Sequence, residues 1–441
     1  MSHSNFRAQI TADKCVACGE CVSICPVNAV TLGTSFDCDG KCQSYEYRHA
    51  TNTVLRKGDL HDDFINERKL TGKYGTAPCK VTCPAHVSVQ GYIQKASEGK
   101  YLEALEVIKQ DNPLPAVCGR ICPHPCEAKC TRNSLDQSLA IDAIKMFVAD
   151  QEREKDKRFV PQKTAQYDNK AAVIGSGPAG LSCAYYLAVD GFKVTVFEKN
   201  ARPGGMLMMG IPSFRLEKEV LDSEIEVLRE LGVEFRCGVE VGRDTTIAAL
   251  REAGYEAFYL AIGAQKSAAL GIPGEELDGV YGGVDFLHEI NSGNKPAVGK
   301  RCAVIGGGNV AMDVCRSAVR LGAEETYIIY RRSEAEMPAD KQEIAEAMSE
   351  GVKFRFLNAP AAIEGENGEV KALRVEIMEL GAPYEKGRRK PEGTGKFEEI
   401  AVDSVIAAIG QTIDWGGTRY RRNGKGKEER RRCGRHRLSD R

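Results

Sequence analysis

This sequence lacks long apolar runs, an apolar stretch near its given N-terminus and an excess of either charge. No stretch approaches the roughly 18 apolar residues of a membrane-spanning helix, and the polar N-terminus, MSHSNFRAQ, has no apolar signal core. The formal net charge of -1 gives no global reason to expect nucleic acid or an acidic membrane as a partner. We therefore expect a cytoplasmic protein that binds neither nucleic acid nor membrane.

Cysteine, in contrast, is abundant. The 441 residues include 17 cysteines, and in a chain without an export signal this number favours cluster ligation over disulfides. Most precede residue 131, in spacings such as CVACGECVSICP, CDGKC, CKVTC and CGRICPHPCEAKC. The simpler alternative for this set is free buried thiols. The later cysteines stand singly, and four of them are expected to be buried and structural: Cys183, Cys237, Cys302 and Cys315.

The first cysteine run has the spacing of a bacterial ferredoxin. Cys15, Cys18 and Cys21 are followed by Cys25 and then proline, the arrangement that binds four-iron, four-sulfur (4Fe-4S) clusters. In two-cluster ferredoxins the fourth cysteine of such a run serves the neighbouring cluster. We therefore expect the first three to share one cluster, and we predict a ferredoxin-like segment over residues 1–60.

A dinucleotide-binding fingerprint, AAVIGSGPAG, occupies residues 171–180. Its apolar start is typical of a buried parallel strand, and it continues into a helix-forming segment. Gly175 allows a tight turn, Gly177 lets the backbone approach a pyrophosphate, and Gly180 lets helix and strand pack closely. The next strand, KVTVFEK, ends in Glu198, at the spacing where an acid holds a ribose 2′-hydroxyl. The predicted nucleotide-binding residues here also include Pro178, Ala179 and Lys199.

A second fingerprint, CAVIGGGNVAMD, occupies residues 302–313. Gly306, Gly308 and Ala311 take the three positions of the motif. The following strand, ETYIIY, ends in Arg331 and Arg332 instead of an acid, and two guanidinium groups suit the 2′-phosphate of NADP(H). The alternative is a solvated basic pair at a strand end. The predicted nucleotide-binding residues also include Asn309, Val310 and Asp313.

These motifs predict an α/β protein with two Rossmann-like dinucleotide-binding domains, one inserted in the other. Apolar periodicity in VQGYIQKASEGKYLEALEVIKQ and AIDAIKMFVAD predicts helices between the ferredoxin-like segment and the first fingerprint. The predicted divisions are a helical iron–sulfur domain at 61–160, a first nucleotide domain at 168–293, a second at 294–400, a return to the first at 401–415, and a basic tail at 416–441.

The tail is strongly basic and has no apolar periodicity, so we expect it to be disordered. Its alternative interpretation is a segment that binds nucleic acid or another anionic partner.

The chain resembles the small subunit of bacterial glutamate synthase and its relatives, from about residue 75 to 415. The matching segments include CPAHVSVQGYI, NPLPAVCGRICPHPCEAKC, PGGMLMMGIPSFRL, YRRSEAEMPA and AAIGQ, in addition to both fingerprints. The resemblance implies FAD in the first nucleotide domain, NADPH in the second, and 4Fe-4S clusters in the helical domain. It places Gly204, Gly205, Leu207 and Arg215 near the flavin, whereas the methionines beside them are equally explained by core packing.

The resemblance also suggests cluster ligands. Cys83, Cys122 and Cys126 are similar to ligands of one cluster, and Cys79 and Cys130 to ligands of another. Two cysteines that the family has just before Cys79 are missing, since that segment reads LTGKYGTAP. Three further cysteines could complete the sets: Cys38, Cys42 and Cys118.

The implied activity is transfer of a hydride from NADPH to FAD, followed by one-electron transfer through the clusters to a catalytic partner subunit or a ferredoxin-like acceptor. No acid–base or nucleophilic triad is expected, so no catalytic side chain is assigned. Relatives continue past AAIGQ with a flavin-contacting Gly-Asp pair that this chain lacks. We therefore expect a truncated or frame-disrupted product, or a flavin site completed by other means, and the alternative is a non-catalytic electron-transfer or assembly scaffold.

Overall fold

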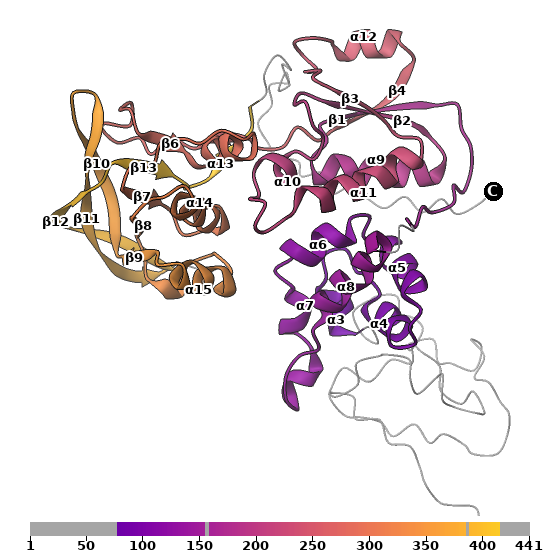
Figure 1. The fold of residues 1–441 in the computed structure, drawn as a ribbon, viewed down its shortest axis with the longest axis horizontal. Coiled ribbons are helices and arrows are strands. Elements are labelled where there is room, and N and C mark those ends of the chain that lie inside the picture. The colour runs from indigo at the N-terminus through magenta and orange to yellow at the C-terminus, as the bar shows by residue number, and fades with distance from the viewer. Residues whose placement is uncertain (1–76, 155–157, 385–387, 415–441) are drawn as a thin grey trace, which may run out of the picture.

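Helices come first in the described chain and parallel sheets follow (Figure 1). A computed structural model describes residues 77–154, 158–384 and 388–414. It shows one helical unit and two α/β units. Each α/β unit contains a parallel sheet. The predicted α/β fold class is therefore confirmed. The ferredoxin-like segment with Cys15, Cys18, Cys21 and Cys25, the pair Cys38 and Cys42, and the basic tail lie outside the described residues.

The helical unit is built from short helices around a small apolar core. Tyr92, Leu105 and Ile108 are almost fully buried, and the Tyr92 hydroxyl donates a hydrogen bond of 2.9 Å to the carbonyl of Ile141. Proline begins three of the helices, where its missing N–H costs no hydrogen bond. The elements are α3 (Pro78–Thr82), α4 (Val89–Ser97), α5 (Tyr101–Lys109), α6 (Pro115–Ile121), α7 (Pro125–Ala128), the 3₁₀ helix η3 (Thr131–Ser134) and α8 (Ile141–Glu154).

Helices α6 and α8 approach each other at Gly119. A Cβ atom on Gly119 would lie 2.7 Å from the Cβ and 2.8 Å from the Cα of Met146. Only glycine allows this distance, because any side chain would press against the backbone of α8. The contact therefore determines how closely the cysteine-bearing helix α6 lies to α8.

The first α/β unit has a four-stranded parallel sheet in the order β3-β2-β1-β4. Its central strands are buried on both faces, as expected of a parallel sheet covered by helices. Figure 1 shows α9 and α11 between this sheet and the helical unit. The elements are β1 (Lys170–Ile174), α9 (Pro178–Asp190), β2 (Lys193–Glu198), α10 (Met206–Met209), α11 (Lys218–Glu230), β3 (Glu234–Cys237), α12 (Ile247–Glu252) and β4 (Tyr255–Leu260).

The second α/β unit has a five-stranded parallel sheet in the order β6-β13-β7-β8-β9. An antiparallel sheet of β10, β11 and β12 packs beside it. The elements are β6 (Val280–Gly282), α13 (Gly283–Asn291), β7 (Arg301–Ile305), α14 (Asn309–Arg320), β8 (Glu325–Tyr330), the 3₁₀ helix η4 (Glu334–Glu336), α15 (Lys341–Ser349), β9 (Lys353–Phe356), β10 (Asn358–Glu366), β11 (Glu369–Pro383), β12 (Arg389–Ala401) and β13 (Ser404–Ala407).

Strand pairing differs from the predicted division at two places. Residues 401–415 were expected to return to the first nucleotide domain, but β13 pairs in parallel with β6 and β7 of the second sheet. Strand β6 also belongs to the second sheet, although it falls within 168–293. The connection between the units contains a short antiparallel ribbon of β5 (Lys266–Ser267) and β14 (Gln411–Thr412). An apolar run shows that a strand is buried, but its partner strands are determined by tertiary packing.

We predict that Gly119→Ala destabilises the protein even though alanine favours helix by about 1 kcal/mol over glycine. The added methyl group would force α6 and α8 apart, at a cost of roughly 1–3 kcal/mol. Urea unfolding followed by circular dichroism measures the change. Gly91→Ala in α4 is the matched control, because its Cβ would meet only side-chain atoms of Ser88 and Val107, which can rotate away. A Gly119→Ala protein as stable as the Gly91→Ala protein would contradict the assignment.

Candidate functional site

Each α/β unit has a glycine turn between a parallel strand and the following helix, β1 and α9 in the first unit and β7 and α14 in the second. Gly175 has φ +101° and Gly306 has φ +141°, so both adopt a conformation that L side chains rarely take. A Cβ on Gly180 would lie 1.9 Å from the carbonyl oxygen of Gly175, which shows how closely helix and strand pack. In contrast, a Cβ on Gly177 or Gly308 would meet no heavy atom within 4 Å. These two N-cap glycines therefore leave open space at the starts of α9 and α14, where a pyrophosphate would fit.

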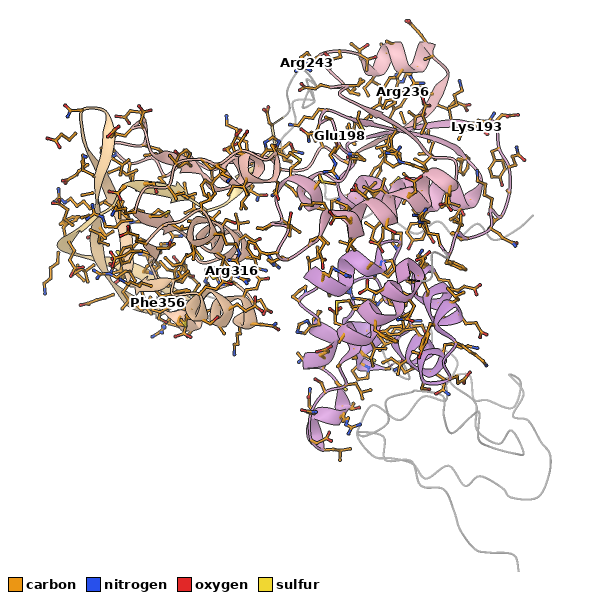
Figure 2. All side chains as sticks on the ribbon, viewed as in Figure 1. Lys193, Glu198, Arg236, Arg243, Arg316 and Phe356 are labelled. Carbon is orange, nitrogen blue, oxygen red and sulfur yellow. The ribbon has the colours of Figure 1, made fainter. Side chains whose placement is uncertain are left out.

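Glu198 ends β2 and lies beside the first glycine turn, in the first α/β unit (Figure 2). The carboxylate accepts hydrogen bonds from the backbone N–H of Ser176 at 2.9 Å and from its hydroxyl at 2.5 Å. It also accepts one from the backbone N–H of Asn200 at 2.9 Å. Glu198 is 3% exposed. In the described structure it therefore stabilises the turn itself, and its predicted contact with a ribose stays a prediction.

The Gly204–Gly205 segment lies against the same turn. The Ser176 hydroxyl accepts a hydrogen bond of 2.9 Å from the backbone N–H of Gly204, and a Cβ on Gly205 would lie 2.7 Å from the Cα of Gly177. Leu207 and Met208 are buried, which agrees with core packing in this segment. The structure thus brings the Gly204–Gly205 segment to the first fingerprint, as expected if both contribute to one flavin site. Pro178, Ala179 and Lys199 are exposed around the turn.

Arg215 joins the two α/β units. Its guanidinium donates to both carboxylate oxygens of Asp313 on α14, at 2.8 and 2.9 Å, and to Glu343 on α15. Burial raises the pKa of Asp313 and raises the pKa of Glu343 to about 7. Next to Arg215 in the sequence, the ring of Phe214 contacts the guanidinium group of Arg316 on α14, 4.8 Å from the ring centroid. Figure 2 shows Arg316 in the second unit. The residue predicted near the flavin is therefore also an interdomain contact.

A cavity of about 740 Å³ opens at the second glycine turn. Its size suits a cofactor. Of the two predicted arginines, Arg331 is exposed, whereas Arg332 is 7% exposed and donates from Nε to the carbonyl of Arg389 at 3.0 Å. Sequence reasoning missed Arg388, which also lines the cavity and donates to the Tyr330 hydroxyl at 2.7 Å. The predicted residues that line this cavity are Gly306, Gly308, Asn309, Val310, Arg331 and Arg332.

Six cysteines of the helical unit lie near the ends of its short helices. Cys83 follows α3, Cys122 follows α6, and Cys126 lies in α7, which packs on α3. Burial, with smaller contributions from neighbouring groups that include the thiols of Cys122 and Cys83, raises the pKa of Cys126 to about 11. These are the three cysteines predicted to share a cluster. All six are free thiols in the structure: Cys79, Cys83, Cys118, Cys122, Cys126 and Cys130.

Donor groups point at two of these sulfurs. The side-chain amide of Gln90 donates to Cys79 Sγ at 3.3 Å, and the backbone N–H of His124 donates to Cys122 Sγ at 3.3 Å. Within the described residues, no three Cys, His, Asp or Glu side chains converge as ligands of a single metal ion would. Thiols with N–H donors nevertheless have the ligand chemistry that an iron–sulfur cluster requires. The other cysteines differ: Cys302 and Cys315 are buried as expected, whereas Cys183 and Cys237 are half-buried.

Helix α6 links the cysteines to the first α/β unit. Glu224 on α11 accepts hydrogen bonds from the first backbone N–H groups of α6, at 2.7 Å from Ala116 and 3.0 Å from Val117. Burial raises the pKa of Glu224 to about 7. From the other end of α6, Arg120 pairs with Glu217 at 2.7 Å and Asp150 at 3.1 Å. The helix that carries Cys118 is thus bonded directly to the unit with the predicted flavin site.

Three family models match the chain. Residues 169–424 match pyridine nucleotide-disulphide oxidoreductase, residues 63–157 match dihydropyrimidine dehydrogenase domain II with a 4Fe-4S cluster, and residues 8–31 match a 4Fe-4S binding domain. These matches confirm the predicted enzyme class and cofactor types. In the described part of the chain, no helix combines the length and the apolar character needed to cross a bilayer.

Several named proteins are similar over most of this chain. The beta subunit of the NADP(+)-dependent formate dehydrogenase of Moorella thermoacetica is 43% identical over 77% of the chain. The small chain of NADPH glutamate synthase is 40% identical in Halomonas elongata and 38% in Escherichia coli, over 76% and 77% of the chain. The chain covers 74% and 76% of these two small chains, which confirms the resemblance. However, it spans about half of the Moorella subunit, 51%.

Among solved structures, FprA of Mycobacterium tuberculosis in complex with NADPH has a TM-score of 0.50. It is 23% identical, and the match covers 56% of this chain and 71% of FprA. This similarity supports the fold of the two α/β units.

We predict that Arg331→Ala weakens NADPH binding without changing NADH binding. Loss of a charge-assisted hydrogen bond to the 2′-phosphate costs roughly 1.5–3 kcal/mol, or about 10- to 150-fold in Kd. Isothermal titration with each nucleotide measures this. Arg332→Ala serves as the comparison, because loss of its buried bond to Arg389 should lower stability and affect both nucleotides alike. Equal losses of NADPH and NADH affinity in Arg331→Ala would show that its role is structural.

Proposed function

The chain belongs to the pyridine nucleotide-disulphide oxidoreductase family, and on that premise we propose that it oxidises NADPH through FAD and delivers single electrons through 4Fe-4S clusters to a partner subunit. The observation that carries this proposal is the bond between Glu224 and α6. It joins α11, in the unit that contains the first glycine turn, to α6, the helix that carries Cys118. The proposed two-electron site and the proposed one-electron carriers therefore lie in units that are bonded to each other.

FAD would supply the chemistry that connects a hydride donor to one-electron carriers. The protein's own residues bind and orient. We propose that Gly177 and the start of α9 bind the FAD pyrophosphate, and that Gly308 and the start of α14 bind that of NADPH. Glu198 holds the first turn through Ser176, and Arg331 selects the 2′-phosphate. Asn309 anchors the second turn, since its side-chain oxygen accepts a hydrogen bond of 2.9 Å from the backbone N–H of Asp340.

The cysteines are proposed as cluster ligands in the groups that the resemblance implies. Cys83, Cys122 and Cys126 bind one cluster, with Cys118 as the candidate fourth ligand, whereas Cys79 and Cys130 contribute to another. The pKa pattern supports the first group, because the three thiols interact electrostatically. For Cys79, the neighbours Cys130 and Cys83 raise its pKa after burial does, so the two groups are adjacent.

The proposal also includes the electron acceptor and the compartment in which the protein works. The similar proteins from Moorella, Halomonas and Escherichia coli are named as subunits or small chains, which supports a partner subunit as the electron acceptor. We also propose a reducing compartment such as the cytoplasm, because cysteines that serve as cluster ligands must stay unoxidised.

The proposal predicts that NADPH alone reduces both chromophores. In protein reconstituted with FAD, iron and sulfide, anaerobic titration with NADPH should lower flavin and cluster absorbance together. The physical reason is that the clusters can take electrons only one at a time, and the flavin is the group that divides the pair. If NADPH reduces neither chromophore in the reconstituted protein, the proposed enzymatic activity is refuted.

Ligand substitutions give a second prediction. Cys83→Ala, Cys122→Ala and Cys126→Ala should each lower bound iron and destabilise the helical unit, because a cluster would join helices that are far apart in sequence. Cys183→Ala, in α9, is the matched control and should leave iron unchanged. Iron and thermal unfolding are measured on the same preparations. If the iron content is unchanged in Cys83→Ala, Cys122→Ala and Cys126→Ala alike, these cysteines are only structural.

A further inference from the structure

Lys145 is a buried lysine that the proposed function does not use. It lies on α8, and the residue is 8% exposed. Its ammonium group pairs with Asp142 one turn earlier, at 2.5 Å. Burial of an ammonium group is costly unless opposite charge surrounds it. Among the described residues, Asp142 on the same helix is the acid that pairs with it, so the cause of this buried position is sought in the neighbouring helix.

Helix α8, which carries Lys145, packs on the cysteine-bearing helix α6. Its neighbour Met146 is the residue that Gly119 of α6 contacts, and α6 carries Cys118 and ends at Cys122. The charge of Lys145 lowers the pKa of both thiols, against the larger effect of burial. The acids that act in the opposite direction are Asp142 on Cys122 and Glu224 on Cys118.

We propose that Lys145 is a positioning residue for the cluster bound through Cys122, and that its fixed positive charge favours the reduced cluster. This inference rests on the proposed function. Cluster potentials depend on net charge and solvent exposure around the sulfurs. Reduction adds a negative charge, so an adjacent buried cation stabilises the reduced form and raises the midpoint potential.

A second buried lysine in the same unit provides a matched control. Lys109 pairs with Glu152 of α8 at 3.0 Å and donates to the carbonyl of Phe159 at 3.0 Å. Like Lys145, it is buried and bonded to an acid of α8. Its contacts are with Glu152 and Phe159, and none of the pKa effects on the cysteines comes from it. Loss of Lys109 therefore tests general damage to the unit.

The experiment is a redox titration of the reconstituted full chain, reduced with dithionite and followed by electron paramagnetic resonance. The relevant signal is the one that Cys122→Ala removes. Lys145→Met should shift the midpoint potential of this signal to a more negative value, whereas Lys145→Arg should keep it near the wild-type value. Lys109→Met should cause no shift. An unshifted Lys145→Met signal, or an equal shift in Lys109→Met, would overturn the inference.

A second variant, with the opposite expected shift in midpoint potential, tests the inference if Lys145→Met fails to fold. Asp142→Asn removes the acid and leaves the lysine charge unbalanced, so the same midpoint potential should become more positive. Absence of that shift would also overturn the inference. Dithionite reduces the clusters without NADPH or FAD, so the two proposals fail differently. A wild-type chain that binds no cluster refutes the proposed function, whereas bound clusters with unshifted potentials refute only the role of Lys145.

Discussion

The arrangement of the two proposed redox sites depends on how helix α6 is held. Gly119 brings α6 against the backbone of α8, and Glu224 of α11 bonds to its first turn. The first contact determines where the cysteines lie within the helical unit. The second determines where that unit lies relative to the glycine turn that begins α9. A change at the first contact would therefore alter the proposed cluster site, and a change at the second would alter its distance from the proposed flavin site.

A second joint connects the two α/β units through Arg215 and its acids Asp313 and Glu343. Both joints contain buried carboxyl groups. Burial raises the pKa of Glu224 and of Glu343 from the ordinary 4.5 to about 7. Between these pH values the folded chain keeps protons that the unfolded chain releases, so both groups lower the free energy of unfolding as the pH rises through this range. Each of the two carboxyl groups nevertheless accepts hydrogen bonds from backbone or guanidinium donors, which no apolar side chain could do.

Local motifs could be predicted from the sequence, whereas long-range pairings could not. The fingerprints predicted the turns because the roles of Gly175 and Gly306 depend only on a strand, a tight turn and a helix. The prediction that residues 401–415 return to the first nucleotide domain was wrong for β13, because the apolar residues of this strand would suit either sheet. Arg388 was missed because it reaches the cavity from the position just before β12, far along the chain from the fingerprint. The sequence also gave no means of separating exposed Arg331 from buried Arg332, and it showed nothing of the bond between Glu224 and α6.

The central claim is that electrons leave the nucleotide through the flavin and then enter clusters held by the helical unit. Rapid anaerobic mixing of NADPH with the reconstituted chain, monitored separately at flavin and cluster wavelengths, tests that order most directly. The account predicts that flavin absorbance falls first and cluster absorbance follows, and that clusters in FAD-free protein are not reduced by NADPH. Reduction of the clusters at the same rate with and without FAD would contradict it.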